Sequence, residues 1–178
     1  MAENQPEESY RLEGVAFGLA DGLIMCLGLI IGVAEATSDS RFVVIAGIIG
    51  GFANAFGNSI GFFMSQSAER ALQIHETADH GATIRIHSKR EISINTLCSF
   101  ASTIAAVLVL LFPFLLLEMN LAIILTFVIG TMISFFLGSY VGRMSGENFY
   151  KEGLKYAILA IVGAIISHLI ADLIQLII

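Results

Sequence analysis

An aspartate lies inside a stretch of sequence that otherwise has the composition of a membrane-spanning helix. The stretch runs from Val15 to Val33, and Asp21 is its one charged residue. A carboxylate at membrane depth costs several kcal/mol unless it is paired, hydrated or bound to a cation. We therefore interpret Asp21 as part of an ion or proton pathway. The alternative is a protonated acid that hydrogen-bonds to a neighbouring helix.

Further potential metal ligands share helix faces with this acid or lie on the next apolar stretch. Met25 follows Asp21 at i+4, on the same face of a helix. Asn54 and Asn58 are one turn apart, on a face of small and polar residues that includes Gly47, Gly51, Gly61 and Ser65. Carboxylate, amide and thioether form a mixed hard and soft ligand set that suits a first-row divalent cation. The alternatives are packing for the methionine and interhelical hydrogen bonds for the asparagines.

Two other groups of polar residues have spacings that suit proton transfer or metal binding. Near the end of the chain, His168, Asp172 and Gln175 follow one another at i, i+4 and i+7, and a histidine there can titrate near neutral pH. We expect His168 and Asp172 to act as a proton relay, or else to be interfacial residues that touch water. The polar segment 67–93 offers a possible cytosolic metal site made of Glu69, His75, Glu76, Asp79 and His80, with an ordinary solvated loop as the alternative.

Composition restricts the class of protein. The 178 residues are 56% hydrophobic and only 13% charged, outside the usual range of a soluble domain. The net charge of -6 argues against a nucleic-acid partner. Cys26 and Cys98 both lie in apolar stretches, where we expect buried thiols rather than a disulfide.

Five stretches are long enough to cross a bilayer, since a helix needs about 20 apolar residues for roughly 30 Å of hydrocarbon. They are residues 14–34, 42–66, 94–117, 121–143 and 155–177, with a cytosolic loop over 67–93. The sequence therefore predicts an all-α membrane protein, a single transmembrane domain of five helices. The second span is expected to continue out of the bilayer as a helix as far as Arg70.

The distribution of Lys and Arg predicts the orientation of these spans. Eight of the nine basic residues fall on one side: Arg11, Arg70, Arg85, Lys89, Arg90, Arg143, Lys151 and Lys155. Only Arg41 falls on the other side, so we expect a cytoplasmic N-terminus and an outside C-terminus. Because no inverted repeat is evident, a pathway between two copies in a two-fold homodimer is our working prediction.

This topology places the candidate ligands together. Span one runs outward and span two returns, so Asp21 and Asn58 both lie roughly 10–12 Å deep at 1.5 Å per residue. Asn54 lies nearer the midplane. Beside Asp21, Gly14, Gly18 and Gly22 form a ridge of small residues that permits close helix contact.

At these residues the chain resembles the vacuolar iron transporter family. The resemblance rests on FGLADGLIMCLGLIIGVAEA in span one, on FFMSQSAER at the end of span two, and on FFLGSYVGRMSGENFYKEGLKY with ISHLIADLI near the C-terminus. It covers nearly the whole chain. It implies a dimeric five-helix transporter that exchanges Fe²⁺, and often Mn²⁺, for protons, with the aspartate of span one on the metal pathway.

The chain departs from the family pattern in span two. Members commonly carry Ser-Met-x-x-Gly-Glu there, whereas this chain has Gly57-Asn58-Ser59-Ile60-Gly61-Phe62. Asn58 replaces the metal-contacting methionine and Phe62 replaces the proton-linked glutamate. An amide oxygen in place of a thioether favours harder cations such as Mn²⁺. The long acidic cytosolic helices of plant members are also missing, which indicates a compact, divergent, prokaryotic relative.

We therefore expect a transporter in a prokaryotic cell membrane that moves Fe²⁺ or Mn²⁺ out of the cytoplasm, possibly by proton antiport. Its metal ligands would be Asp21, Met25, Asn54 and Asn58. The ion would be a transported substrate, with no permanently bound cofactor, and the partners would be the lipid bilayer and a second copy. The alternatives are a transporter or channel for a non-metal solute on the same scaffold, and a membrane-embedded enzyme or structural protein.

Overall fold

Five long α-helices make up the described part of the chain. The computed structural model describes residues 8–80 and 86–177, with side chains over 12–77 and 86–177. The helices are α1 (Glu8–Thr37), α2 (Ser40–His80), α3 (Lys89–Leu116), α4 (Met119–Met144) and α5 (Phe149–Ile177). Each contains a segment long and apolar enough to cross a membrane. The predicted all-α, five-span class is confirmed.

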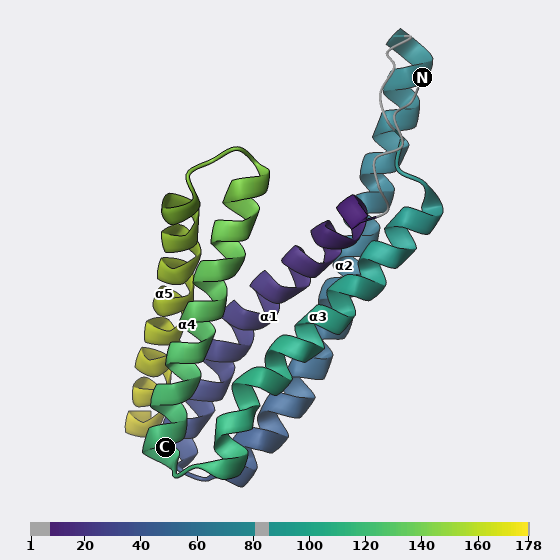
Figure 1. Cartoon of the computed structure of the whole chain (residues 1–178). Helices are drawn as coiled ribbons and strands as arrows, with labels where there is room; N and C mark the ends of the chain where they lie inside the picture. Colours follow the sequence, from purple (N-terminus) through teal and green to yellow (C-terminus); the bar gives the residue numbers. More distant parts are fainter. Residues whose placement is uncertain (1–7, 81–85, 178) are drawn as a thin grey trace.

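The helices form a bundle around α1, which packs against each of the other four. In Figure 1, α2 and α3 lie on one side of α1, and α4 and α5 lie on the other. The end of α2, the start of α3 and the connection from α4 to α5 lie at one end of the bundle, here called the loop end. The short connections at Ser38–Asp39 and Leu117–Glu118, with the C-terminal part of α5, lie at the opposite end, the turn end.

The segment 67–93, expected to be a loop, is largely helical. As predicted, α2 continues beyond the apolar span, but it runs on to His80 and contains 41 residues. At 1.5 Å per residue it is about 60 Å long, twice the thickness of the hydrocarbon core. Helix α3 begins at Lys89 behind a capping box, in which Ser88 Oγ accepts from the Glu91 N–H at 3.1 Å and the Glu91 carboxylate accepts from the Ser88 N–H at 2.7 Å.

The predicted glycine ridge of α1 is the closest-packed part of the bundle, and its partner is α3. A Cβ atom added at Gly14 would lie 2.1 Å from the backbone oxygen of Asn95, and one at Gly18 would lie 2.1 Å from that of Ser99. At Gly18 the two backbones are also joined by a side chain, because Thr103 Oγ1 donates to the Gly18 carbonyl at 2.9 Å. Only glycine permits this approach. The α1–α3 contact fixes the rotation of α1 and hence the direction of Asp21.

Candidate metal-binding site

The structure brings Asp21 and Asn54 together across the α1–α2 hairpin. Asn54 Nδ2 donates to Asp21 Oδ2 at 2.7 Å, and both side chains are partly buried. Asp21 lies 17 residues before Ser38 and Asn54 lies 15 residues after Asp39, so both are roughly 23–26 Å from the turn end. The pair therefore lies deep within the apolar length of both helices.

Among the described residues, the carboxylate of Asp21 has a neutral partner and no cationic one. Within the described residues, no Lys, Arg or His nitrogen lies within ion-pair distance of Asp21. An amide donor satisfies one lone pair but does not offset the charge. Asp21 therefore stays a candidate cation ligand.

Asn58 and Met25, the other two predicted ligands, lie near this pair without bonding to it. Asn58 is half-buried, and its Nδ2 is buried with no hydrogen-bond partner in the described part of the chain. Met25 lies one turn along α1 from Asp21 and is 43% exposed. Within the described part of the chain no polar contact holds either side chain, so both could turn toward a bound ion.

The small and polar face predicted along α2 divides into two parts. Its first part packs on α3, because a Cβ added at Gly47 or Gly51 would meet Leu111 or Val107 within 2.6 Å. Its second part is open, since a Cβ added at Gly57 or Gly61 would meet nothing within 4 Å. Residues spaced three and four apart form a row that turns slowly around the axis of a straight α-helix, so the two ends of the row face different neighbours. The open part begins beside Asn54 and Asn58.

An aromatic pair separates this pair from the loop end. Phe17 of α1 and Phe62 of α2 stack with ring centroids 4.8 Å apart and an interplanar angle of 30°. Phe17 precedes Asp21 by one turn, and Phe62 is 7% exposed. An apolar contact thus lies between Asp21 and the loop end.

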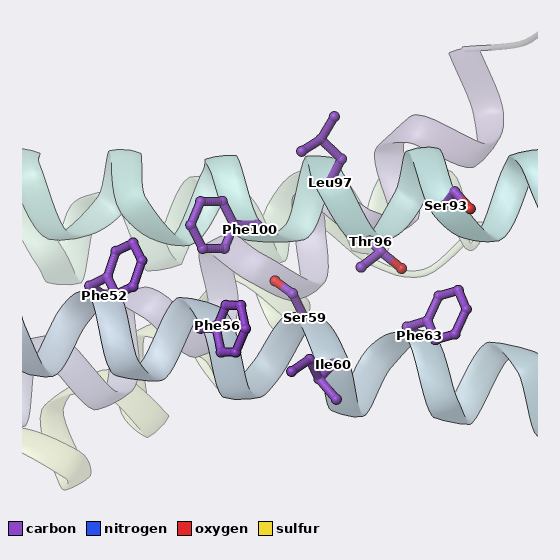
Figure 2. Close-up of a pocket in the computed structure, with 9 residues that line it drawn as sticks. All are labelled: Phe52, Phe56, Ser59, Ile60, Phe63, Ser93, Thr96, Leu97 and Phe100. Carbon is purple, nitrogen blue, oxygen red and sulfur yellow. The ribbon is translucent and has the colours of Figure 1, made fainter.

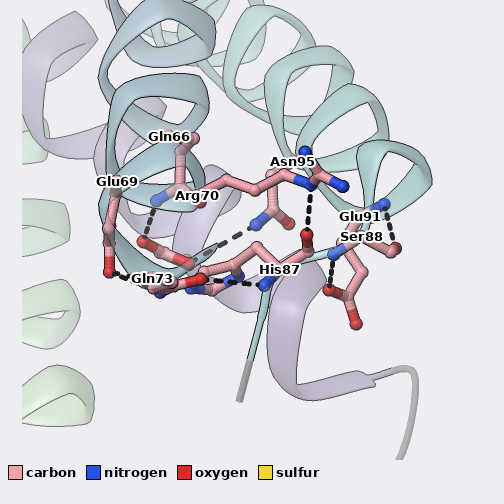
Figure 3. Close-up of polar contacts among 9 residues, drawn as sticks. Gln66, Glu69, Arg70, Gln73, His87, Ser88, Glu91 and Asn95 are labelled. Atoms are coloured by element: carbon pink, nitrogen blue, oxygen red, sulfur yellow. Dashed lines mark hydrogen bonds and ion pairs between the residues drawn. The ribbon is translucent and has the colours of Figure 1, made fainter. Parts of the chain in front are cut away.

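A second carboxylate, Glu13, lies one further turn toward the loop end and was not among the predicted site residues. Gln66 Nε2 donates to Glu13 Oε1 at 2.6 Å, and Asn95 Nδ2 donates to Glu13 Oε2 at 3.4 Å (Figure 3). The three side chains come from α1, α2 and α3. The sequence signal was an acid eight residues before Asp21 with amides at the ends of the next two spans.

At the turn end the structure adds a partner to the predicted proton relay. His168 Nδ1 lies 2.5 Å from Glu35 Oε2 on α1, and His168 Nε2 lies 3.7 Å from Asp172 Oδ2. Gln175 Nε2 donates to the Glu35 backbone oxygen at 2.9 Å. Glu35 follows Asp21 by 14 residues, about 21 Å along α1, so this cluster is separate from the Asp21–Asn54 pair.

The predicted cytosolic metal residues lie on the extension of α2 beyond the membrane span. Glu69 lies 3.7 Å from His87 Nε2 and accepts from Gln73 Nε2 at 3.2 Å. His75 and Glu76 are exposed, while the side chains of Asp79 and His80 lie outside the described residues. Over the described part of the chain, no three His, Cys, Asp or Glu residues are grouped to hold a metal. This site therefore stays a prediction.

The arrangement of Arg70, Gln73 and His87 holds the start of α3 against α2. Arg70 Nε donates to the His87 carbonyl at 2.9 Å, and the His87 N–H donates to Gln73 Oε1 at 3.0 Å. Figure 3 shows these contacts beside Gln66 and Asn95. The loop end of the α2–α3 pair is thus tied by hydrogen bonds close to the Glu13 cluster.

A groove between α2 and α3 is too apolar to bind an ion. It has a volume of about 510 Å³ and is lined mainly by apolar side chains, namely Phe52, Phe56, Ile60, Phe63, Leu97 and Phe100, with Ser59, Ser93 and Thr96 (Figure 2). Its lining includes no charged group, and the Ser59 hydroxyl donates to the Ala55 carbonyl. We assign no cation binding to this groove.

Comparison with known proteins supports the family suggested by the sequence. The profile of the VIT family matches residues 12–94, which cover the α1–α2 hairpin and the start of α3. An uncharacterized protein of Methanocaldococcus jannaschii, MJ0645, is 30% identical over 163 residues, covering 86% of this chain and 84% of the relative. With five helices long and apolar enough to span a membrane, the chain is an integral membrane protein, and its family indicates a transporter of metal ions. The chain belongs to the VIT family.

Proposed function

We propose that this protein moves a divalent transition metal, Fe²⁺ or Mn²⁺, out of the cytoplasm in exchange for protons. The observation that carries the proposal is the Asp21–Asn54 pair, a carboxylate deep in the bundle that has an amide partner and, among the described residues, no cationic one. Such a charge persists in a membrane helix when a cation visits it. Asn54 and Asn58 supply amide oxygens, and Met25 supplies a thioether one turn along α1 from Asp21.

The basic residues support a cytoplasmic loop end. Within the described side chains, six basic residues lie toward this end: Arg70, Lys89, Arg90, Arg143, Lys151 and Lys155. Arg41 lies next to the α1–α2 turn. By the positive-inside rule, the loop end faces the cytoplasm and the turn end faces outward. We place the protein in a prokaryotic cell membrane, and the archaeal relative supports that placement.

The open face of α2 supports a two-fold homodimer as the transporting unit. Gly57 and Gly61 leave room for close contact, and Asp21 on the adjoining side of α1 is only partly buried by its own chain. A carboxylate directed at lipid is costly, whereas a second copy can cover it and line a pathway. In this arrangement two copies of Asp21 face a shared passage.

The experiment that tests the proposed function is metal flux into sealed proteoliposomes. Wild-type protein is expected to carry Mn²⁺ and Fe²⁺ across the membrane faster than protein-free vesicles, and an opposing proton gradient is expected to accelerate this flux. Flux equal to that of empty vesicles for both metals would overturn the proposal.

Replacement of Asn58 with methionine is expected to shift the metal preference toward Fe²⁺. A thioether is a softer ligand than an amide oxygen, and the Asn58 amide makes no hydrogen bond through Nδ2 that the change would break. We expect the ratio of Fe²⁺ to Mn²⁺ flux to rise about tenfold, equivalent to roughly 1.4 kcal/mol. Competition between the two metals in one vesicle preparation measures this ratio. An unchanged ratio would remove Asn58 from the metal site.

Glu35, His168 and Asp172 are proposed as the outward-facing proton relay. Replacement of Glu35 with glutamine removes the carboxylate that holds His168 Nδ1. We expect the variant to retain basal metal flux and to lose most of its acceleration by a proton gradient. Glu118→Gln is the matched control, since Glu118 lies at the same end, is exposed and makes no side-chain cap. Equal acceleration in both variants would contradict the relay.

The aromatic stack of Phe17 and Phe62 favours a second candidate, transport of a non-metal solute on the same scaffold. It replaces an acid of the family with an apolar surface beside the Asp21–Asn54 pair. A thermal-shift screen discriminates, because a ligand that binds only the folded state raises the melting temperature. A shift with an organic or anionic solute, and none with any divalent metal, would favour this second function.

A further inference from the structure

Three helices bring oxygen-bearing side chains together at the loop end, away from Asp21. Glu13 of α1 is contacted by the amide of Gln66 from α2 and by that of Asn95 from α3, at 2.6 and 3.4 Å. Both amide side chains are buried, with exposed fractions of 5% for Gln66 and 0% for Asn95. The two amides are therefore built into the bundle, and they hold a carboxylate that is itself exposed (Figure 3).

Within the described residues, the amide oxygens of this cluster accept no hydrogen bond. Gln66 Oε1 and Asn95 Oδ1 are buried and lack hydrogen-bond partners within the described part of the chain. Buried acceptors without partners are unfavourable, so two in one cluster require an explanation. The terminal torsion of an amide is broad, which allows each group to turn and direct its oxygen at the position now occupied by nitrogen.

Turned in this way, the two amides and the carboxylate present oxygen atoms from three helices to one point. Without a cation this arrangement is repulsive, because each oxygen is an acceptor and Glu13 carries a negative charge. With a hard divalent cation it is favourable, since carboxylate and amide oxygens are the ligands that such ions prefer. Within the described residues, Glu13 forms no ion pair with a Lys, Arg or His side chain.

The cluster is distinct from the Asp21–Asn54 pair. Glu13 precedes Asp21 by eight residues, about 12 Å along α1. The stacked rings of Phe17 and Phe62 lie between the two levels, because Phe17 is one turn from each acid. An ion at one level cannot be shared with the other.

We propose that Glu13, Gln66 and Asn95 form a second site for a hard divalent cation, with oxygen ligands only, at the loop end of the bundle. As a step that precedes Asp21 in transport it rests on the proposed function, but as a binding site it does not. The amides hold the carboxylate when the site is empty and turn their oxygens inward when a cation binds.

The test is the stoichiometry of Mn²⁺ binding to the purified full-length protein in lipid nanodiscs. The electron paramagnetic resonance signal of free Mn²⁺ measures how many ions remain unbound. Wild-type protein is expected to bind two ions per chain, and Glu13→Gln and Asp21→Asn are each expected to bind one. Glu147→Gln is the matched control, an exposed carboxylate in the α4–α5 connection at the same end of the bundle. It is expected to bind two.

A second variant distinguishes a cation site from a purely structural network. Gln66→Glu removes a donor and places a second carboxylate beside Glu13. For a cation site, we expect Mn²⁺ to bind more than tenfold tighter and to raise the melting temperature of this variant more than that of wild type. A structural network predicts lower stability that Mn²⁺ does not restore, and that result would overturn the proposal.

The outcomes separate this inference from the proposed function. Unchanged stoichiometry in Glu13→Gln, with one ion lost in Asp21→Asn, would overturn the second site and leave the transport proposal standing. One ion lost in Glu13→Gln, with unchanged stoichiometry in Asp21→Asn, would support the second site and contradict metal binding at Asp21.

Discussion

Replacement of Asp21 with asparagine is expected to abolish most metal transport. Asparagine has nearly the same shape and its amide oxygen can still accept from Asn54 Nδ2, so the α1–α2 contact is retained. What is lost is the negative charge that attracts the cation. A charged interaction of about 3 kcal/mol corresponds to a decrease of roughly 100-fold in flux. Initial rates of Mn²⁺ flux in proteoliposomes measure the effect.

The control for this variant removes the same charge where no ion is expected to pass. Glu118→Gln alters an exposed carboxylate at the turn between α3 and α4. It should transport at the wild-type rate, and both variants should melt within a few degrees of wild type. Transport by Asp21→Asn at the rate of Glu118→Gln would contradict the assignment of Asp21 to the metal pathway.

Replacement of Gly18 with alanine is expected to destabilise the bundle more than any other single methyl group added to the ridge. The new Cβ atom would lie 2.1 Å from the Ser99 backbone oxygen and 2.2 Å from Ser102 Oγ. Because a backbone atom cannot rotate away, α1 and α3 must separate. We expect a loss of about 3 kcal/mol, or roughly 6–12 °C in melting temperature for a chain of this length.

Gly32→Ala is the matched control for this change, on the same helix. A Cβ atom at Gly32 would meet its nearest neighbour, the Ser167 backbone oxygen, at 3.5 Å, an ordinary van der Waals distance. Its melting temperature should stay close to that of wild type. A Gly18→Ala protein as stable as Gly32→Ala would show that α1 and α3 are not in the close contact described.

The number of helices and their tightest contact could be predicted from the sequence because both depend on local pattern. Five apolar stretches of sufficient length define the spans, and glycines at every fourth position of α1 define a ridge. The partner of that ridge could not be predicted. Gly18 meets Ser99, which is distant in the chain, and such a contact depends on the packing of the whole bundle.

The extent of α2 and the start of α3 were predicted less well. Hydropathy identifies only the part of a helix that lies in lipid, so the polar continuation of α2 to His80 was assigned mostly to a loop. The start of α3 did carry a readable signal. Ser88 followed three residues later by Glu91 is a capping box, and the structure shows both of its hydrogen bonds.

The candidate site was predicted in part. The sequence placed Asp21 at the depth of Asn58 and put Asn54 nearer the midplane, whereas the structure joins Asp21 to Asn54 by a hydrogen bond. Glu13 and Glu35 were missed, since acids near the ends of spans are ordinarily explained by contact with water. Their partners lie on other helices, and helix rotation decides those contacts.

The most direct test of a cation beside Asp21 is a crystal structure of the protein soaked in Mn²⁺, with anomalous scattering recorded at the manganese edge. The account predicts an anomalous peak about 2–2.5 Å from a carboxylate oxygen of Asp21, with an amide oxygen of Asn54 or Asn58 turned toward it. An Asp21 carboxylate that keeps its Asn54 hydrogen bond in a fully soaked crystal, with no anomalous peak beside it, would contradict the account.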